Sequence, residues 1–237
     1  MNILLTNDDG YTATGIKLLK KLLSKYGRVV IVAPLEAMSA MSVSITLRKP
    51  LHLQKHEEDV YSLSGTPADC VAFGLSSLGI DFDLVVSGCN HGLNVSYDVL
   101  FSGTIGACLM GLTYHKKCMA ISCENNFDIV EKHFDEFYRY IVCKDLLSTQ
   151  YLLNVNFPIK EEVKGIKLTT LYYRDETTYF IKDNDDYIAL RNLKHEYDSD
   201  KDSDCYAVYH SYISITPLDK TCFNIDLFNR IKRIEEK

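Results

Sequence analysis

Residues 2–33 read NILLTNDDGYTATGIKLLKKLLSKYGRVVIVA and contain a strand–helix–strand pattern. The runs Asn2–Thr6 and Val29–Ala33 are short and continuously apolar, as in strands buried on both faces. Between them, Ile16–Tyr26 carries apolar residues at helical spacing, and Gly27 predicts the end of that helix. Two buried strands joined by a helix predict an α/β fold, with a mostly parallel sheet covered by helices.

The same alternation continues to Pro158. Further strands are expected at 60–63, 83–87, 119–122 and 151–155, with extended pieces at 42–47 and 51–53. Helices are expected from Pro67 onward and at about 104–114 and 128–142. For the helix that begins at Pro67, Thr66 fits the N-cap and Asp69 fits the acidic position of a capping box.

After Pro158 the pattern changes to alternating tyrosines and charges. Strand-like pieces occur at 167–172, 179–181 and 212–216, and apolar residues in 224–235 predict a final amphipathic helix. We therefore expect an α/β core in residues 1–158 and a β-rich arm with a C-terminal helix in residues 159–237, together forming one structural unit.

The composition of the chain argues against some classes of binding partner. The chain has 237 residues and a formal net charge of −6, which argues against nucleic acid or an anionic membrane as the main partner. None of its 8 cysteines has C-x-x-C spacing, so buried free thiols in a reducing compartment are expected. The N-terminus lacks the features of a signal peptide, and no apolar run is long enough to span a bilayer. A cytoplasmic protein is the expectation.

Polar clusters follow three of the expected strands. Asp8 and Asp9 end the first strand in NDDG, a serine-rich loop at 34–46 contains Ser39, and SGCNHGLN occupies 87–94. Because the carboxyl ends of parallel strands lie at one sheet edge, these clusters should open on the same site. Adjacent carboxylates suit a hard divalent cation.

A fourth cluster, Ser102-Gly103-Thr104, precedes an expected helix, whose N-terminus favours phosphate. Each cluster alone also fits a solvated turn or an ordinary N-cap. In combination they offer ligands for a cation and donors for an anion, which phosphoester hydrolysis requires. The sequence contains no P-loop, dinucleotide fingerprint, nucleophile elbow or H-E-x-x-H motif.

Five segments carry a family resemblance: ILLTNDDG (3–10), SGTPADCV (64–71), VVSGCNHGLN (85–94), DVLFSGT (98–104) and YISITPL (212–218). In this order they resemble the SurE 5′/3′-nucleotidases. The resemblance implies a Rossmann-like three-layer core and a β-arm that exchanges between subunits in a homodimer or homotetramer. It also implies release of phosphate from nucleoside 5′- or 3′-monophosphates, with short-chain polyphosphate as a further substrate class.

The resemblance also implies roles for individual residues. The family's ligands for one divalent ion, Mg²⁺ or Mn²⁺, fall on Asp8, Asp9, Ser39 and Asn90 of this sequence. Family positions around the phosphate fall on Asn7, Asn94, Ser102, Gly103 and Thr104. Asp8 and Asp9 are thus the expected catalytic pair, holding the ion while water attacks phosphorus, and one of them also accepts a proton.

The chain departs from the family pattern in places. Met38-Ser39-Ala40 stands where Arg-Ser-Gly is usual, so the loop loses a cation and a glycine. Similar departures occur at 13–16 and 209–211, and they affect substrate preference and arm geometry. Two other hypotheses stay open: a nucleotide-binding regulatory protein without catalysis, and a metal-dependent transferase. Transferases of that kind usually carry Asp-x-Asp, whereas the acids here are adjacent.

Overall fold

The computed structural model describes residues 1–124, 127–160, 162–173, 176–193, 199–220 and 232. The strands are β1 (Asn2–Thr6), β2 (Arg28–Pro34), β3 (Leu53–Glu57), β4 (Val60–Leu63), β5 (Leu84–His91), β6 (Lys117–Cys123), β7 (Tyr151–Asn156), β8 (Gly165–Leu168), β9 (Glu176–Asp183), β10 (Asp186–Leu193) and β11 (Tyr212–Asp219). The helices are α1 (Thr14–Leu23), α2 (Pro67–Ser77), α3 (Asp98–Phe101), α4 (Gly103–Thr113), α5 (Phe127–Cys143) and α6 (Asp204–Tyr209).

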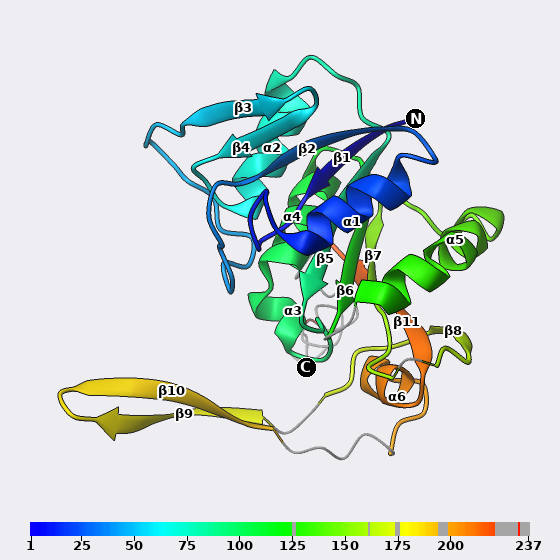
Figure 1. The fold of residues 1–237 in the computed structure, drawn as a ribbon. Coiled ribbons are helices and arrows are strands. Elements are labelled where there is room, and N and C mark those ends of the chain that lie inside the picture. Colours follow the sequence, from blue (N-terminus) through cyan, green and yellow to red (C-terminus); the bar gives the residue numbers. More distant parts are fainter. Residues whose placement is uncertain (125–126, 161, 174–175, 194–198, 221–231, 233–237) are drawn as a thin grey trace.

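Nine of these strands form one sheet in the order β3-β4-β2-β1-β5-β6-β7-β11-β8 (Figure 1). The six strands from β4 to β7 in this order are parallel, whereas β3 and β11 run antiparallel to β4 and β7. The α/β class with a mostly parallel sheet, predicted from the sequence, is confirmed.

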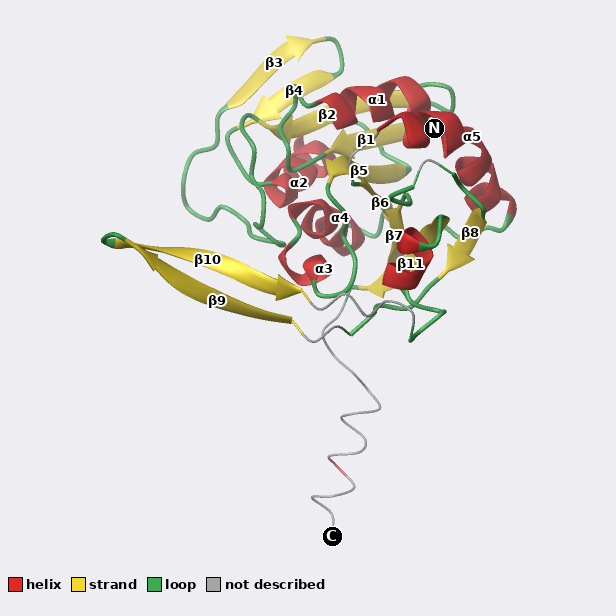
Figure 2. Ribbon diagram, turned by 60° about the horizontal axis from the view of Figure 1, so that its bottom comes forward, coloured by secondary structure: helices red, strands yellow, loops and turns green. Residues whose placement is uncertain are grey.

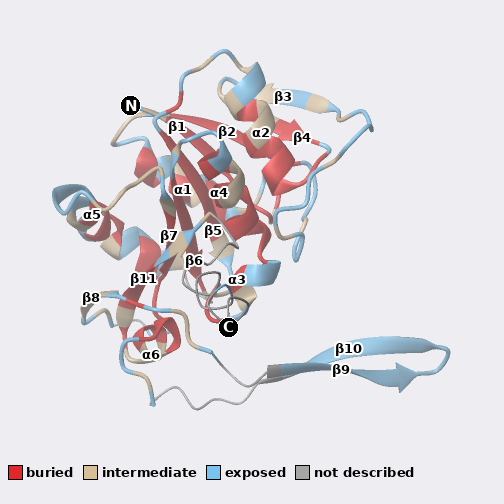
Figure 3. Cartoon of the chain, turned by 180° about the vertical axis from the view of Figure 1, so that it is seen from behind, coloured by how far each residue is buried: buried red, intermediate tan, exposed pale blue. Residues whose placement is uncertain are grey.

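Side-chain alternation along β1 explains the three layers. Ile3 and Leu5 pack into a core with residues of α1 and α5, and Leu4 packs into a second core with residues of α2 and α4. All three are fully buried, so both faces of the sheet are covered. Figure 1 shows α1 and α5 in front of the sheet, and Figure 3, seen from behind, shows α2 and α4 on the other face.

The first helix ends earlier than predicted. α1 stops at Leu23, because Ser24 caps it and Tyr26 N donates to Leu23 O at 2.8 Å in a tighter turn. Apolar spacing up to Tyr26 therefore overstated the helix, although Tyr26 still packs against the core.

The expected extended piece at 42–47 is wrong. These residues form turns and irregular backbone, with Ser42 at φ 50° and its N–H bonded to Phe101 O at 3.0 Å. Ser42 also packs against Gly106 of α4, where any side chain would overlap the carbonyl oxygen of Ser42. Contact with α4 overrides the local alternation. The piece expected at 51–53 is likewise mostly irregular, and β3 begins only at Leu53.

The chain after Pro158 is divided between the sheet and a protruding hairpin. β11 and β8 extend the main sheet, whereas β9 and β10 form a separate two-stranded hairpin that projects from the body (Figures 1 and 2). Asp204, buried at the start of α6, accepts hydrogen bonds from Ser96 N at 2.8 Å and Tyr172 N at 2.9 Å. It thereby joins the root of the hairpin to the segment before α3. The boundary at 158 stays a prediction.

Three further elements, β10, α3 and α6, were not predicted from the sequence. The final helix expected at 224–235 lies outside the described residues apart from Lys232. Within the described part of the chain, no helix is both long and apolar enough to cross a membrane.

The capping box at the start of α2 yields a stability prediction. Thr66 Oγ1 accepts from Asp69 N at 3.1 Å and donates to Ser44 O at 2.6 Å. Thr66→Ala should lower the free energy of unfolding by about 1–2 kcal/mol, or roughly 2–8 °C in melting temperature by calorimetry. Ser76→Ala, an exposed change on the same helix, is the control and should leave the melting temperature unchanged. Equal melting temperatures for both variants would contradict the role of the cap.

Candidate active site

A hollow of about 230 Å³ opens at the carboxyl edge of the parallel strands. It is lined by Asp8, Asp9, Ser39, Ala40, Asn90, His91, Leu93, Asn94, Asp98, Phe101 and Ser102. Six of the nine residues predicted from the sequence are in this lining. They come from the ends of β1 and β5, the loop after β2 and the start of α4, which supports the expectation that separate polar clusters meet at one sheet edge.

Asp8 and Asp9 occupy different environments. Asp8 is 5% exposed, and its Oδ1 accepts from Thr104 Oγ1 at 2.7 Å. Burial raises the pKa of Asp8 and the charge of Asp9 raises it further, while the Thr104 hydrogen bond opposes both. Asp9 is partly exposed, and its Oδ2 lies 3.4 Å from His91 N. Two carboxylates of like charge therefore meet in a site that disfavours the ionised form of at least Asp8.

Asn7, Gly103 and Thr104, predicted at the phosphate, lie behind the lining. Asn7 and Thr104 are fully buried, and Asn7 Nδ2 donates to Gly10 O at 2.9 Å. A β-carbon at Gly103 would lie 2.9 Å from Asp8 Cβ, so only glycine lets the start of α4 approach this closely. In this structure the three residues support the β1 turn and Asp8 and do not face the hollow.

Of the hydroxyl residues in the loop at 34–46, only Ser39 lines the hollow, next to Ala40. The loop is fixed by Met38 N, which donates to Asp8 O at 2.7 Å. Thr46 is turned away, because its Oγ1 donates to Asp69 Oδ2 at 2.6 Å. Ala40 has φ 59°, a left-handed conformation that suits the glycine usual at this family position.

The SGCNHGLN cluster, expected as a loop, belongs partly to β5. The strand continues to His91 with an irregularity between Gly88 and Asn90. Asn90 Nδ2 donates to Gly92 O at 2.8 Å, so the side-chain oxygen of Asn90 is the atom available to a cation. Such strand irregularities re-aim side chains next to functional sites.

Asp98 and Phe101 of α3 line the hollow and were not singled out in the sequence. Arg191 of the hairpin contacts both: its Nη1 lies 2.8 Å from Asp98 Oδ1, and its guanidinium carbon lies 5.9 Å from the Phe101 ring centroid. The motif DVLF directly before SGT could have pointed to Asp98. No sequence motif points to Arg191, because this residue comes near α3 only in the folded chain.

The donor set fits a hard divalent cation. Asp8, Asp9, Ser39 and Asn90 offer carboxylate, hydroxyl and amide oxygens, the ligands that Mg²⁺ and Mn²⁺ prefer. The Oδ1 of Asn7 is buried beside them with no hydrogen-bond partner among the described residues. In the described chain, no group of three or more His, Cys, Asp or Glu side chains is arranged to hold a metal.

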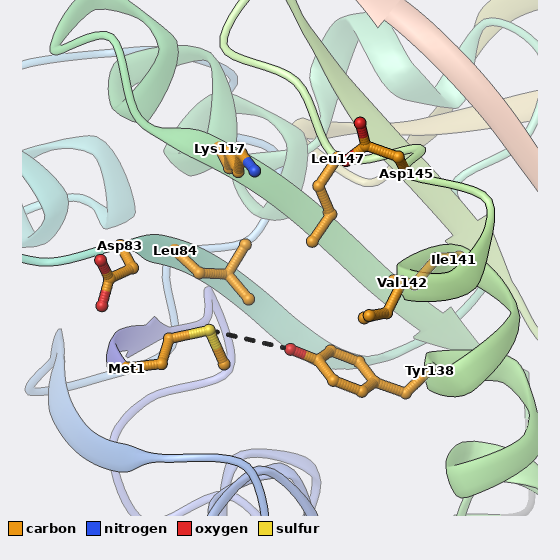
Figure 4. A pocket seen from close by; sticks show the side chains of 9 residues that line it. All are labelled: Met1, Asp83, Leu84, Lys117, Tyr138, Ile141, Val142, Asp145 and Leu147. Atoms are coloured by element: carbon orange, nitrogen blue, oxygen red, sulfur yellow. Dashed lines mark hydrogen bonds between the residues drawn. The ribbon is translucent and has the colours of Figure 1, made fainter.

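A larger hollow of about 300 Å³ lies at the opposite edge of the sheet (Figure 4). Its floor is mainly apolar and includes Leu84 and Tyr138, whose hydroxyl lies 4.0 Å from Met1 Sδ. None of the predicted site residues lines it. Its charged lining residues, Asp83, Lys117 and Asp145, lie at the amino edge of the parallel strands, whereas ligands of such sheets bind at the carboxyl edge, so the smaller hollow is the candidate active site.

The fold and the site define a Rossmann-like α/β protein with paired aspartates at the carboxyl edge of its sheet. Comparison with known proteins identifies the family. The sequence model described as "Survival protein SurE" matches residues 3–178, and the chain belongs to the SurE family.

Individual relatives agree with this assignment. The chain is 37% identical over its full length to the full-length "5′-nucleotidase SurE" of Clostridium botulinum strain Alaska E43. It is 40% identical to the protein of the same name from strain ATCC 19397, over 95% of this chain and 96% of that relative. The crystal structure of the SurE protein from Aquifex aeolicus superposes with a TM-score of 0.85 at 33% identity, covering 99% of this chain and 100% of that one.

The environment of Asp8 predicts a gain in stability on neutralisation. Since its folded pKa is raised, the folded state binds more protons than the unfolded state, and stability without metal falls as pH rises through the folded pKa. In chelator at neutral pH, Asp8→Asn should therefore stabilise the protein by about 1 kcal/mol and flatten this pH dependence, as measured by urea unfolding. The exposed Asp202→Asn is the control. An Asp8→Asn protein that is less stable than wild type in chelator would refute the claim that the site disfavours the ionised form of Asp8.

Proposed function

We propose that this chain is a phosphomonoesterase that releases inorganic phosphate from nucleoside 5′-monophosphates and requires one divalent metal ion. The observation that carries the proposal is the convergence of Asp8, Asp9, Ser39 and Asn90 on one hollow beside the start of α4. The names of full-length relatives, "5′-nucleotidase SurE", support the same reaction class.

Asp8, Asp9, Ser39 and Asn90 would hold the ion, which is Mg²⁺ or Mn²⁺. When bound, such an ion neutralises charge on a phosphate ester and makes its phosphorus more open to attack. The carboxylate pair is suited to it because Asp8 and Asp9 otherwise repel each other in a buried setting.

The start of α4 is suited to the phosphate. Ser102 caps this helix, because its Oγ accepts from Ile105 N at 3.2 Å, and its hydroxyl proton remains able to donate to a phosphate oxygen. The positive end of the helix dipole adds to the attraction for an anion. Asn94 contributes a further polar side chain to the same lining.

Attack by water suits the arrangement better than a covalent intermediate. Among the described residues, Ser102 Oγ has a hydrogen bond only to Ile105 N, so it has no adjacent base to activate it. Asp9 is the better placed carboxylate to accept a proton from water, because it is partly exposed, whereas Asp8 is buried and already accepts from Thr104. His91, the last residue of β5, lines the hollow with an exposed side chain.

A phosphate-release panel tests this proposal. Nucleoside 5′- and 3′-monophosphates and short polyphosphate should be assayed with Mg²⁺, Mn²⁺ or chelator; the 3′ and polyphosphate activities stay predictions. Activity should require the metal, and Asp8→Asn or Asp9→Asn should lower kcat/KM by about 100- to 1,000-fold. Asp202→Asn is the matched control and should retain wild-type rates. Near wild-type turnover by Asp8→Asn with Mn²⁺ would contradict the assignment.

A nucleotide-binding regulatory protein without catalysis is the second candidate. The loop at 38–40 favours it, because Met38 and Ala40 replace the usual Arg and Gly, and Ala40 occupies a left-handed conformation. Binding of a nucleotide in calorimetry, without phosphate release at saturating Mn²⁺ or Mg²⁺, would favour this reading.

Self-association through the arm is part of the proposal. On one face of the hairpin, Tyr179 pairs with Leu190 and Ile181 pairs with Ile188, and all four side chains are exposed. An apolar face on a projecting hairpin fits contact with another subunit, giving the dimer or tetramer expected from the family. Nucleic acid and membranes are not proposed as partners, given the net charge of −6, and the cytoplasmic location stays a prediction.

The arm can be tested directly. Ile181→Lys combined with Ile188→Lys places two like charges opposite each other on the apolar face and should dissociate the oligomer in sedimentation velocity. Ser76→Lys, an exposed change on α2, is the control and should leave the sedimentation coefficient unchanged. A monomeric wild-type protein, or an oligomer that survives the double change, would exclude this interface.

A further inference from the structure

We infer that Asn154 and Asn156 of β7 are positioning residues of the active site, which hold Asn94 in place for phosphate binding. The inference rests on the proposed function, because it assigns Asn94 to the phosphate side of the hollow. Neither asparagine lines the hollow, and both are fully buried. They act through Asn94, which is 5% exposed and does line it.

The side chain of Asn156 pairs with the main chain of Asn94 at both ends. Its Oδ1 accepts from Asn94 N at 2.8 Å, and its Nδ2 donates to Asn94 O at 3.1 Å. One carboxamide thus takes the place of a neighbouring strand. Since both polar groups of the Asn94 main chain are occupied, only its side chain remains for a ligand.

Two further bonds fix the same residue. Asn154 Nδ2 donates to Asn94 O at 2.7 Å, so that carbonyl accepts two hydrogen bonds. The side chain of Asn94 is held as well, because its Nδ2 lies 2.8 Å from Ser122 Oγ on β6. Asn94 is therefore constrained in main chain and side chain by three buried residues on two adjacent strands.

The partners of these side-chain hydrogen bonds indicate a role for Asn154 and Asn156 outside the sheet. The β7 main chain already pairs with β6 and β11, so the sheet itself does not need the side-chain amides. Apart from a 3.4 Å contact with each other, the side chains of Asn154 and Asn156 make hydrogen bonds, within the described part of the chain, to Asn94 alone. Buried amides are costly unless they are satisfied, and here their partner is the one residue of this network that lines the hollow.

Asn156→Asp separates positioning from folding. The change keeps the shape but replaces a donor to Asn94 O with a carboxylate oxygen, so Asn94 should shift. We expect the Kd for inorganic phosphate in the presence of Mn²⁺, measured by calorimetry, and the KM for the best nucleotide to rise about tenfold or more. The Mn²⁺ concentration for half-maximal activation should change less than about twofold, because Asp8, Asp9, Ser39 and Asn90 are untouched.

Asn154→Ala is the milder variant, because Asn156 still donates to Asn94 O. It should raise the same Kd and KM by about threefold, and it decides the matter if Asn156→Asp does not fold. Thr216→Val is the matched control: Thr216 lies opposite Asn154 on β11 and is buried, and its side chain has one hydrogen-bond partner among the described residues, Thr169 Oγ1 at 2.8 Å. It should lower the melting temperature but leave the Kd and KM at wild-type values.

The outcomes distinguish this inference from the proposed function. Absence of turnover in the wild-type protein would overturn the proposed function. The phosphate Kd of the variants would still test the positioning role of Asn154 and Asn156. Wild-type Kd and KM in folded Asn156→Asp and Asn154→Ala proteins would overturn the positioning role, even if the enzyme is active. Equal shifts in Thr216→Val would also overturn it, because they would trace the effect to general destabilisation. The positioning role would also be overturned if the wild-type protein bound no phosphate.

Discussion

The burial of the Asp8 carboxylate, next to the like charge of Asp9, is the constraint around which this sheet edge is built. The two carboxylates are consecutive in the chain, and Asp8 is withdrawn almost completely from water. Neighbouring elements partly offset the free-energy cost of burying Asp8. Thr104 donates to the Asp8 carboxylate, and Met38 N donates to the Asp8 main-chain carbonyl. Gly103 allows α4 to begin against the Asp8 side chain. β1, the loop after β2 and α4 therefore all contact one acidic residue, Asp8.

Polar groups around the hollow are satisfied to different degrees. Near the aspartates, the buried atoms Thr6 Oγ1, Asn7 Oδ1 and Ser87 Oγ have no hydrogen-bond partner among the described residues. Ser96 Oγ, two residues from Asn94, is in the same position, but both main-chain groups and the side chain of Asn94 itself are bonded to buried residues. The unsatisfied atoms beside the aspartates suit a charged ligand, and the fixed Asn94 suits the orientation of an anion.

The sequence was sufficient to predict the α/β class, the capping box of α2 and the meeting of polar clusters at one edge, because these depend on local periodicity and on the direction of parallel strands. It was insufficient where contacts between distant segments decide the conformation. Alternation at 42–47 predicted an extended segment, but packing on Gly106 produces turns. Asn154 and Asn156 read as ordinary strand residues, since their partner Asn94 is far away in the chain. Arg191 reaches Asp98 only through the folded hairpin.

Asp204 has a mechanical consequence. Its two oxygens receive one N–H from the segment that leads into α3 and one from the chain just before the hairpin. The carboxylate thus links the chain that leads towards the hairpin to the segment that leads into the short helix carrying Asp98 and Phe101. A displacement at Tyr172 would therefore reach the rim of the hollow through one buried side chain.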